Sequence, residues 1–171
     1  GLVCVYVLVL QTKFTVDTLT GVSNRIVALR YLESELPYYR RHPNRSLHFL
    51  MMDMDHFKHI NDEYGHLEGD AALVLLAGIL KKVCANYNGV LARYGGDEFV
   101  LLLSHIPPEK FRSILERIRG AVYTTEIPQY ENIHPTVSIG GVYQAHPLVE
   151  AIRRADKLMY WAKQKRNDVQ T

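Results

Sequence analysis

The sequence predicts an α+β fold in which a mostly antiparallel central sheet is flanked by helices. Apolar segments of strand length alternate with amphipathic helical segments along the chain. Two of the strand-like segments, residues 90–94 and 97–104, are separated only by Gly95 and Gly96, which is a strong signal for a β-hairpin. With 171 residues and 47% apolar content, the chain can bury one core without disulfides. We therefore expect one main domain built around this hairpin.

The charge of the chain argues against a general nucleic-acid-binding protein. Its 20 basic and 18 acidic residues are well mixed and give a formal net charge of +2. The basic clusters are limited to Arg40 with Arg41 and, near the end, Lys163, Lys165 and Arg166. Clusters of this size are too small to line a nucleic-acid groove. We therefore expect no nucleic-acid partner.

Residues 2–10, LVCVYVLVL, form a continuous apolar run at the start of the chain. The run is about half as long as the roughly 18 residues of a membrane span, and it lacks the basic leader of a signal peptide. Its β-branched residues favour a strand, and the stub of a membrane helix is the alternative. Cys4 and Cys84 lie in apolar stretches and are expected to be reduced core residues of a cytoplasmic domain. We assign residues 1–16 to an upstream region or linker and residues 17–171 to the main domain.

The main domain opens with a polar turn over residues 16–25, in which Ser23 or Asn24 can cap a helix. Pro37 is expected to end or kink this helix, and residues 42–46 form a loop. The apolar side of the helix consists of Ile26, Leu29, Leu32 and Leu36.

The next segment, residues 47–54, is apolar and too short for a helix, so it predicts a buried strand. A short helix is expected over about residues 57–63, ending at Gly65, and a long helix over about residues 69–85. The apolar side of the long helix consists of Leu73, Leu76, Leu80 and Val83.

After the hairpin, the two prolines at 107–108 break the chain before another helix over about residues 109–122. Residues 135–142 predict one more strand, and the last helix is expected over about residues 148–164. Helical crossovers are thus combined with an antiparallel hairpin, as in an α+β sheet covered by helices.

Two pairs of carboxylates are the first sign of chemistry. Asp53 and Asp55 follow the buried strand, and a single pair of this kind is usually a set of helix caps or surface acids. Asp97 and Glu98 open the strand after the glycines, so Asp97 meets Asp53 if the hairpin lies beside that strand. Close carboxylates repel each other unless they are protonated or bridged by a cation. Oxygen ligands without a full cage suit Mg²⁺ shared with phosphates, and two such ions can activate an attacking hydroxyl.

The segment from 55 to 70 supplies groups that a nucleotide needs. Residues 55–57 turn into a helix, whose free N–H groups and dipole favour an anion, and Lys58 adds a positive charge. Asn61 and Asp70 can converge on a base and read complementary edges, as guanine requires. The alternative is structural: Asn61 ends a helix, and Asp70 is a first-turn acid stabilised by the helix dipole.

These segments together resemble the GGDEF domain family, the diguanylate cyclases of bacterial signalling. Five motifs occur in the family's order: DTLTGVSNR, DMDHFKHINDEYGHLEGD, RYGGDEF, TVSIGG and ADKLMYWAKQKRN. The resemblance covers about residues 17–167. It implies a nucleotidyl-cyclase, palm-like catalytic domain that joins two GTP molecules into cyclic di-GMP and releases pyrophosphate. It further implies a homodimer in which each domain holds one GTP, and a sensory domain upstream in the full-length protein.

The resemblance also implies roles for individual residues. Asp53, the Met54 carbonyl and Asp97 match the ligands of Mg²⁺, with Mn²⁺ as an alternative ion, and Glu98 assists them. Asp97 also matches the residue that helps to deprotonate the attacking 3′-hydroxyl. The positions that match substrate ligands are the backbone of His56 and Phe57, Lys58, Asn61, Asp70, Gly95, Gly96, Lys163 and Arg166. Of these, the backbone of His56 and Phe57, together with Lys58 and Lys163, matches the groups that hold phosphates. Lys58 also belongs to the catalytic set. Gly95 and Gly96 let the backbone turn beside the nucleotide.

The sequence departs from the family pattern at two functional positions. Where many members carry an RxxD motif for product inhibition, residues 86–89 read NYNG, which offers neither a guanidinium nor a carboxylate. The terminal motif AKQKRN lacks the family's glycine, so Lys163 keeps its place while Arg166 lies one residue early.

An active cyclase is the leading functional hypothesis, and a catalytically silent, regulatory GTP-binding module is the alternative. Only the altered terminal motif favours the silent module. Mixed use of ATP and GTP is a third hypothesis. Asp70 argues against it, because a carboxylate accepts the N1 proton and the exocyclic amine that guanine offers together.

Overall fold

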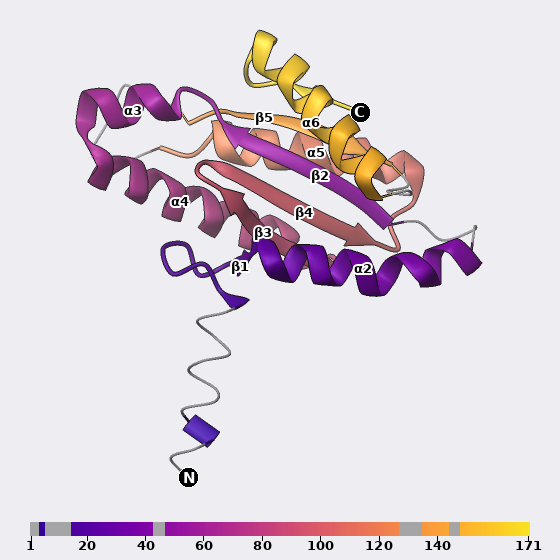
Figure 1. The fold of residues 1–171 in the computed structure, drawn as a ribbon. Coiled ribbons are helices and arrows are strands. Elements are labelled where there is room, and N and C mark those ends of the chain that lie inside the picture. The colour runs from indigo at the N-terminus through magenta and orange to yellow at the C-terminus, as the bar shows by residue number, and fades with distance from the viewer. Residues whose placement is uncertain (1–3, 6–14, 43–46, 127–134, 144–147) are drawn as a thin grey trace.

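The computed structural model describes residues 4–5, 15–42, 47–126, 135–143 and 148–171. It shows a six-stranded sheet with helices on both faces (Figure 1). The strands are β1 (Ser23–Asn24), β2 (Leu47–Met54), β3 (Gly89–Gly95), β4 (Glu98–Ser104), β5 (Val137–Val142) and β6 (Val169–Gln170). The helices are α2 (Arg25–Arg41), α3 (Phe57–Tyr64), α4 (His66–Cys84), α5 (Pro108–Tyr123) and α6 (Leu148–Lys165).

The strands lie in the order β1-β3-β4-β2-β5-β6, which confirms the predicted mostly antiparallel sheet. The central pairs β3–β4, β4–β2 and β2–β5 are antiparallel, and only the two-residue edge strands β1 and β6 pair in parallel. The sequence analysis missed both edge strands, because two residues are too few to show a strand period.

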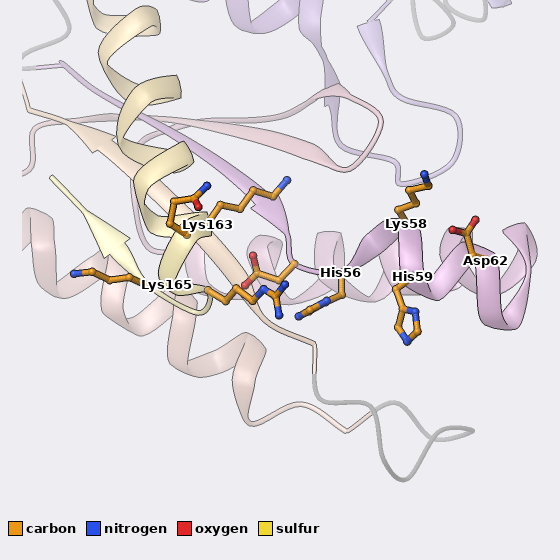
Figure 2. A pocket seen from close by; sticks show the side chains of 9 residues that line it. His56, Lys58, His59, Asp62, Lys163 and Lys165 are labelled. Atoms are coloured by element: carbon orange, nitrogen blue, oxygen red, sulfur yellow. The ribbon is translucent and has the colours of Figure 1, made fainter.

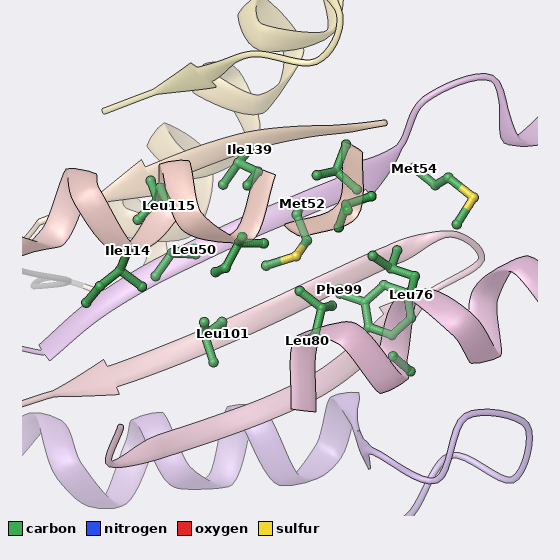
Figure 3. Close-up of a cluster of buried hydrophobic side chains, with 14 of the residues drawn as sticks. Leu50, Met52, Met54, Leu76, Leu80, Phe99, Leu101, Ile114, Leu115 and Ile139 are labelled. Atoms are coloured by element: carbon green, nitrogen blue, oxygen red, sulfur yellow. The ribbon is translucent and has the colours of Figure 1, made fainter. Parts of the chain in front are cut away.

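Period-two alternation along β2 separates two cores. Leu50, Met52 and Met54 face α4 and α5, where they pack with Leu76 and Leu115 among others (Figure 3). Alternate residues of the same strand, including Phe49 and Met51, pack instead with α2 and α6. Asp53 follows the second series, so the register of β2 points this carboxylate toward α6.

Helix α2 is capped as predicted but passes through its proline. The side chain of Asn24 accepts a hydrogen bond of 3.2 Å from the Val27 N–H, which confirms one of the two predicted caps. Pro37 was expected to end or kink this helix, yet the helix continues to Arg41. Pro37 is exposed, so the carbonyl that loses its partner faces water, while buried Leu36 and Tyr39 hold the turn on the sheet.

The other helices agree with the predictions to within a few residues. Helix α3 ends at Tyr64 with Gly65 as its C-cap, and α4 begins at His66, three residues before the predicted start. The predicted apolar side of α4 is buried at Leu73, Leu76 and Leu80 and partly buried at Val83. In α2, by contrast, Ile26 is 48% exposed and Ala28 lies in the core in its place.

The hairpin turn lies one residue later than predicted. Gly95 belongs to β3 and pairs with Glu98, so the two turn residues are Gly96 and Asp97. Gly96 has a φ of +49°, a region that glycine enters without a clash of a Cβ. An irregular register between Arg93 and Gly95 accommodates the shift. Asp97 therefore sits in the turn itself, and Glu98 opens the strand.

The predictions for the start of the chain find little support. Most of the strand predicted at 2–10 lies outside the described residues, and Cys4 and Val5 are helical and exposed. Cys4 is therefore no core residue, whereas Cys84 is half-buried, and both thiols are free. Most of the loop at 42–46 also lies outside the described residues. Within the part that the structure describes, no helix has both the length and the apolar character needed to cross a membrane.

Helix α6 packs against β5 with unusually close backbones. A Cβ added to Gly140 would lie 2.2 Å from the Ala155 carbonyl oxygen and 2.3 Å from the Met159 nitrogen. Only glycine allows this approach, since real Cβ atoms essentially never lie so close to backbone atoms. The first glycine of the TVSIGG motif thus sets the distance between α6 and the sheet.

Candidate active site

The ends of β2 and β4 bring the predicted acidic residues together. Asp53 pairs with Glu98 across the antiparallel ladder, and the Met54 N–H donates a hydrogen bond of 3.4 Å to the Asp97 carbonyl. This confirms that the hairpin lies beside the strand, as the sequence analysis required. Asp53 and Glu98 both face α6, because each belongs to the series of its strand that packs on that side.

Asp53 is buried but incompletely satisfied. It is 4% exposed, and its Oδ2 accepts a hydrogen bond of 2.5 Å from the Lys163 ammonium. Its Oδ1 is buried and makes no hydrogen bond to any residue that the structure describes. Burial and the neighbouring carboxyl of Asp97 raise the pKa of Asp53 to about 8, although Lys163 opposes this shift. The site thus holds more negative charge than its single lysine balances.

The same excess of negative charge shifts the pKa values of two neighbours of Asp53, Glu98 and Lys163. Burial, and then the carboxylates of Asp97 and Asp156, raise the pKa of Glu98 above its ordinary value. Burial alone would lower the pKa of Lys163, but its hydrogen bond to Asp53 and the charge of nearby carboxylates raise it. Perturbed carboxylates around one lysine are typical of sites that bind or react.

The second acid of the DMD motif, Asp55, lies just beyond β2 and has a different environment. It is also 4% exposed, but both of its oxygens accept hydrogen bonds. The donors are Thr136 Oγ1 and Ser138 Oγ, each at 2.7 Å, and the backbone N–H of Asn167 at 2.9 Å. The structural interpretation of this residue as a helix cap or surface acid was wrong. Asp55 joins three segments of the fold, and its neighbouring Asp53 is the open carboxylate.

A cavity of about 830 Å³ lies between the start of α3 and the end of α6 (Figure 2). Its lining includes the basic side chains Lys58, Lys163, Lys165 and Arg166, the histidines His56 and His59, and the carboxylates Asp55 and Asp62. The two groups come from segments about a hundred residues apart in the sequence, and in Figure 2 Lys163 and His56 extend toward each other's segment. Such a lining suits a multiply charged anion.

The turn into α3 has the geometry predicted for an anion site. His56, the N-cap residue, has a φ of +59°, and its side chain does not cap the first turn of α3. The N–H groups of that turn, beginning at Phe57, therefore lack a side-chain cap, and the helix dipole adds positive potential. Lys58 follows on the same turn and lines the cavity.

Asn61 and Asp70 come together at the corner between α3 and α4. A Cβ added to Gly69 would lie 1.9 Å from Asn61 Oδ1, so the amide of Asn61 packs directly on the Gly69 backbone. Asp70, the next residue, is exposed. The structure thus brings both predicted base-reading residues to one corner, with Gly69 providing the space for Asn61.

Gly95 and Gly96 leave open space at the hairpin. No atom of the described residues lies within 4 Å of a Cβ added to either glycine. Packing within the chain therefore does not require glycine at 95, although the positive φ does at 96.

The residues of the terminal motif that follow α6 have left-handed backbone conformations. Helix α6 ends at Lys165, and Arg166 and Asn167 have φ values of +58° and +46°. A left-handed residue after a helix is the position that glycine usually takes. Arg166 thus occupies the glycine position, and its side chain still lines the cavity beside Lys163.

A second, smaller cleft of about 440 Å³ lies on the other side of Lys163. Asp53 and Glu98 line it together with Asp156 and Tyr160 of α6. The sequence analysis missed Asp156, because a single acid on an amphipathic helix normally faces solvent. It also assigned no role in a phosphate cavity to His59, Asp62 and Lys165, which line the larger cavity.

The residues at the end of β2 suit a hard cation completed by a substrate. No group of three or more His, Cys, Asp or Glu side chains in the described part of the chain is placed to hold a metal alone. However, Asp53 has a buried oxygen without a partner, and a second carboxylate lies beside it. Mg²⁺ commonly binds to one or two carboxylates together with substrate phosphates and water. The donor set fits such an ion.

Comparison with known proteins identifies the family. The family model for the diguanylate cyclase GGDEF domain matches residues 14–168. Diguanylate cyclase DgcP of Pseudomonas aeruginosa is 38% identical over 162 residues, which cover 92% of this chain and 24% of the relative. Diguanylate cyclase DgcZ of Escherichia coli is 33% identical over 163 residues, covering 94% of this chain and 53% of the relative. The chain spans less than half the length of DgcP and of the probable cyclase DgcC of Escherichia coli.

Solved structures agree with this result. The coiled-coil and GGDEF domain of DgcB from Caulobacter crescentus, in complex with c-di-GMP, superposes with a TM-score of 0.90 at 25% identity, covering 98% of this chain and 91% of that one. Diguanylate cyclase SiaD of Pseudomonas aeruginosa, in complex with its activator SiaC, has a TM-score of 0.82 at 30% identity, covering 97% and 65%. Motifs, topology and relatives therefore lead to one assignment: the chain belongs to the GGDEF diguanylate cyclase family.

Proposed function

We propose that this chain condenses two GTP molecules into cyclic di-GMP and releases pyrophosphate. The observation that carries the proposal is the environment of Asp53, which has one buried oxygen without a partner beside a second carboxylate. A purely structural acid at this position would have its hydrogen bonds satisfied, as Asp55 does. The cation-lined cavity that begins on the other side of Lys163 supports a phosphorylated substrate.

We assign the triphosphate to that cavity. Lys58 and Lys163 supply positive charge from opposite walls, and the uncapped first turn of α3 supplies N–H groups from His56 and Phe57. Arg166 adds a guanidinium from the position where the family has glycine. The guanine base would bind at the corner formed by Asn61 and Asp70, where an amide and a carboxylate present complementary hydrogen-bonding groups.

Asp53, the Met54 carbonyl, Asp97 and Glu98 are proposed to hold magnesium, which would neutralise phosphate charge and lower the pKa of the attacking 3′-hydroxyl. The protein would supply the acceptor for the proton, and we propose Asp97, a partly exposed residue of the hairpin turn, for this role. Lys163 would leave Asp53 for the phosphates when the cation arrives, because its ammonium and the cation compete for the same carboxylate.

A cyclic dinucleotide needs two equivalent attacks, each by one 3′-hydroxyl on the other nucleotide. One cavity of about 830 Å³ between α3 and α6 provides for one triphosphate, so we propose that two copies of the domain face each other. The GGDEF domain of DgcB was crystallised with c-di-GMP, and SiaD was crystallised with an activator, which supports product recognition and control by a partner in this family.

The alternative is a GTP-binding module that does not turn over. The rearranged terminal motif favours it, because Arg166 and Asn167 stand where the family has glycine and arginine. Incubation of the protein at high concentration with GTP and Mg²⁺, followed by chromatography, separates the two functions. Cyclic di-GMP with pyrophosphate is the expected product, and bound but unchanged GTP would establish the silent module.

The same assay tests the base. Excess ATP should not reduce the rate of cyclic di-GMP formation, because adenine lacks the pair of donors that Asp70 would accept from guanine. Formation of mixed cyclic dinucleotides would show that the corner at Asn61 and Asp70 does not select guanine. Gel filtration with and without GTP should accompany a negative result, since an unpaired domain cannot complete the reaction.

A further inference from the structure

We infer that Asp55 is a positioning residue that holds the C-terminal end of α6 and thereby directs Lys163 and Arg166 into the phosphate cavity. The inference rests on the proposed function for its kinetic consequence. The structural part of the inference, which is the attachment of the C-terminal end of α6 to Asp55, rests on contacts within the chain. The motif comparison assigns no role to this second acid of DMD.

Asp55 joins the exit of β2, the start of β5 and the C-terminal end of α6. It lies just beyond β2, and its backbone N–H donates a hydrogen bond of 2.9 Å to the Thr136 carbonyl before β5. Its Oδ1 accepts a bond from Ser138 Oγ, and its Oδ2 accepts bonds from Thr136 Oγ1 and the Asn167 N–H. Three donors occupy most of the lone-pair positions of one carboxylate. Asp55 is thus a structural acceptor with little capacity left for a ligand.

The bond to Asn167 is the one that reaches α6. After Lys165 the chain makes two successive left-handed residues, Arg166 and Asn167, without a glycine to make this conformation easy. The Arg166 N–H still bonds to the Ala162 carbonyl at 2.8 Å, and the next N–H, that of Asn167, goes to Asp55. The carboxylate therefore acts as the acceptor that stabilises an otherwise strained helix end.

The chain beyond this turn is tied to the sheet as well. The Ile139 N–H donates a bond of 3.0 Å to the Asp168 carbonyl, and β6 then pairs in parallel with β5. Near the middle of α6, the close backbone contact at Gly140 sets the distance from the sheet. Asp55 supplies the remaining constraint, which is the position of the turn that immediately follows the cationic end of the helix.

This turn decides where two proposed phosphate ligands point. Lys163 lies one helical turn before Asn167, and Arg166 lies directly before it. Both line the same cavity as Lys58. The carboxylate of Asp55 also contributes to the raised pKa of Lys163, after the larger contributions of Asp53 and Asp97 and against the opposing effect of burial. If the turn loosens, these cations lose their fixed position relative to α3.

The test compares Asp55→Asn and Asp55→Ala with the wild-type protein. The asparagine keeps a carbonyl oxygen for the Asn167 N–H but loses the charge, so the KM for GTP should rise about 3-fold to 5-fold. The alanine removes the acceptor, and the KM should rise about 10- to 100-fold. In both variants kcat should stay within about 3-fold of wild type, because Asp55 does not touch the reacting atoms.

Ser104→Ala is the matched control, since it removes a buried hydroxyl bonded to the Asn88 carbonyl at the opposite end of β4. This control should lower stability without raising the KM for GTP. Amide hydrogen exchange gives a readout independent of GTP. The Asn167 N–H should be protected in wild type, partly protected in Asp55→Asn and exchanging fast in Asp55→Ala.

An unchanged Asn167 exchange rate in Asp55→Asn and Asp55→Ala would overturn the inference, as would a KM increase matched by Ser104→Ala. A kcat loss much larger than the KM effect would also contradict it, because Asp55 would then act in the chemistry. If Asp55→Ala does not fold, the exchange and KM values of Asp55→Asn decide alone. A wild-type protein that fails to use GTP would refute the proposed function, while the exchange at Asn167 would still test the role of Asp55.

Discussion

Asp53 and Asp55 are the same residue type, lie two positions apart and are equally buried, yet their environments are opposite. Asp55 accepts three hydrogen bonds that connect β2, β5 and the end of α6. Asp53 has one partner, Lys163, a buried oxygen without any described partner, and a carboxyl neighbour that raises its pKa. Complete satisfaction marks a residue that stabilises the fold, and incomplete satisfaction marks a residue that awaits a ligand.

The difference arises from what each residue meets at the end of the strand. Both side chains face the α6 side: Asp53 does so through the register of β2, and Asp55 through its bonds to Ser138 and to the Asn167 N–H after α6. Asp53 is still within the ladder, where its neighbour is the acidic hairpin of β4. Asp55 has passed the ladder and meets hydroxyls and a backbone N–H. One strand thus delivers a reactive acid and its supporting acid to neighbouring positions.

The largest expected effect is the difference in cyclic di-GMP formation between Asp53→Asn and Asp55→Asn. Asp53→Asn should reduce cyclic di-GMP formation by about 1,000-fold or more, because a neutral amide cannot replace a charged metal ligand. Asp55→Asn should keep kcat within about 3-fold. Product formation at saturating GTP measures both. Glu116→Gln on α5, an exposed acid paired with Arg119, is the control and should have wild-type activity. Equal losses at positions 53 and 55 would remove the distinction between the two acids.

A smaller effect is expected in the pH dependence of the unfolding free energy, measured without added metal. The raised pKa means that folded Asp53 keeps a proton that the unfolded chain releases near the ordinary value of 3.8. The unfolding free energy of the wild type should therefore fall as pH rises from about 4 to about 8, because the folded state binds more protons in this range. Asp53→Asn should lose this slope.

At pH 8 the same variant should be more stable than wild type by about 2 kcal/mol. Urea denaturation at several pH values with a chelator present measures both quantities, and Asp55→Asn should show no such gain. A wild-type stability that is constant between pH 4 and 8 would contradict the proposed conflict at Asp53.

The smallest expected effects come from two glycines of α4, of which Gly69 is tightly packed and Gly78 has open space around it. Gly69→Ala should weaken GTP binding about 10-fold, because a Cβ would lie 1.9 Å from Asn61 Oδ1 and displace the amide. Gly78→Ala is its match on the same helix, with nothing within 4 Å of the added Cβ. It should leave GTP binding unchanged and raise stability by about 0.5–1 kcal/mol. Calorimetric titration with GTP would decide, and equal affinities for the two variants would argue against Asn61 as a base ligand.

The sequence analysis predicted elements better than details of turns. Residues 47–54 and the hairpin were recognisable because apolar runs and glycines act locally. The turn was displaced to Gly96 and Asp97 because the strand pairing, including an irregular register, sets where a hairpin closes. Pro37 remained helical because its neighbours are held by the core, a tertiary effect that exceeds the local preference.

The candidate site shows the same limit. The two pairs of acids at strand ends indicated Asp53 and Asp97, the resemblance to a family added Lys163, and the structure brings Asp53 and Lys163 into contact. Asp55 was interpreted as a cap or surface acid, since nothing near it in the sequence shows its donors. Arg166 was interpreted as lying one residue early, which is the glycine position of the family pattern, and its positive φ agrees with that interpretation.

By itself, the sequence determined the fold class, the order along the chain of the helices and the four longer strands, and the chemical types of the groups at the strand ends. These properties depend on side chains within a few residues of one another. The tertiary structure decided which of the two carboxylates, Asp53 or Asp55, keeps an oxygen without a hydrogen-bond partner among the described residues. Lys163 reaches Asp53 across 110 residues, and the donors to Asp55 come from 81, 83 and 112 residues away. Contacts over such separations exist only after the sheet and α6 have packed, so no local pattern records them.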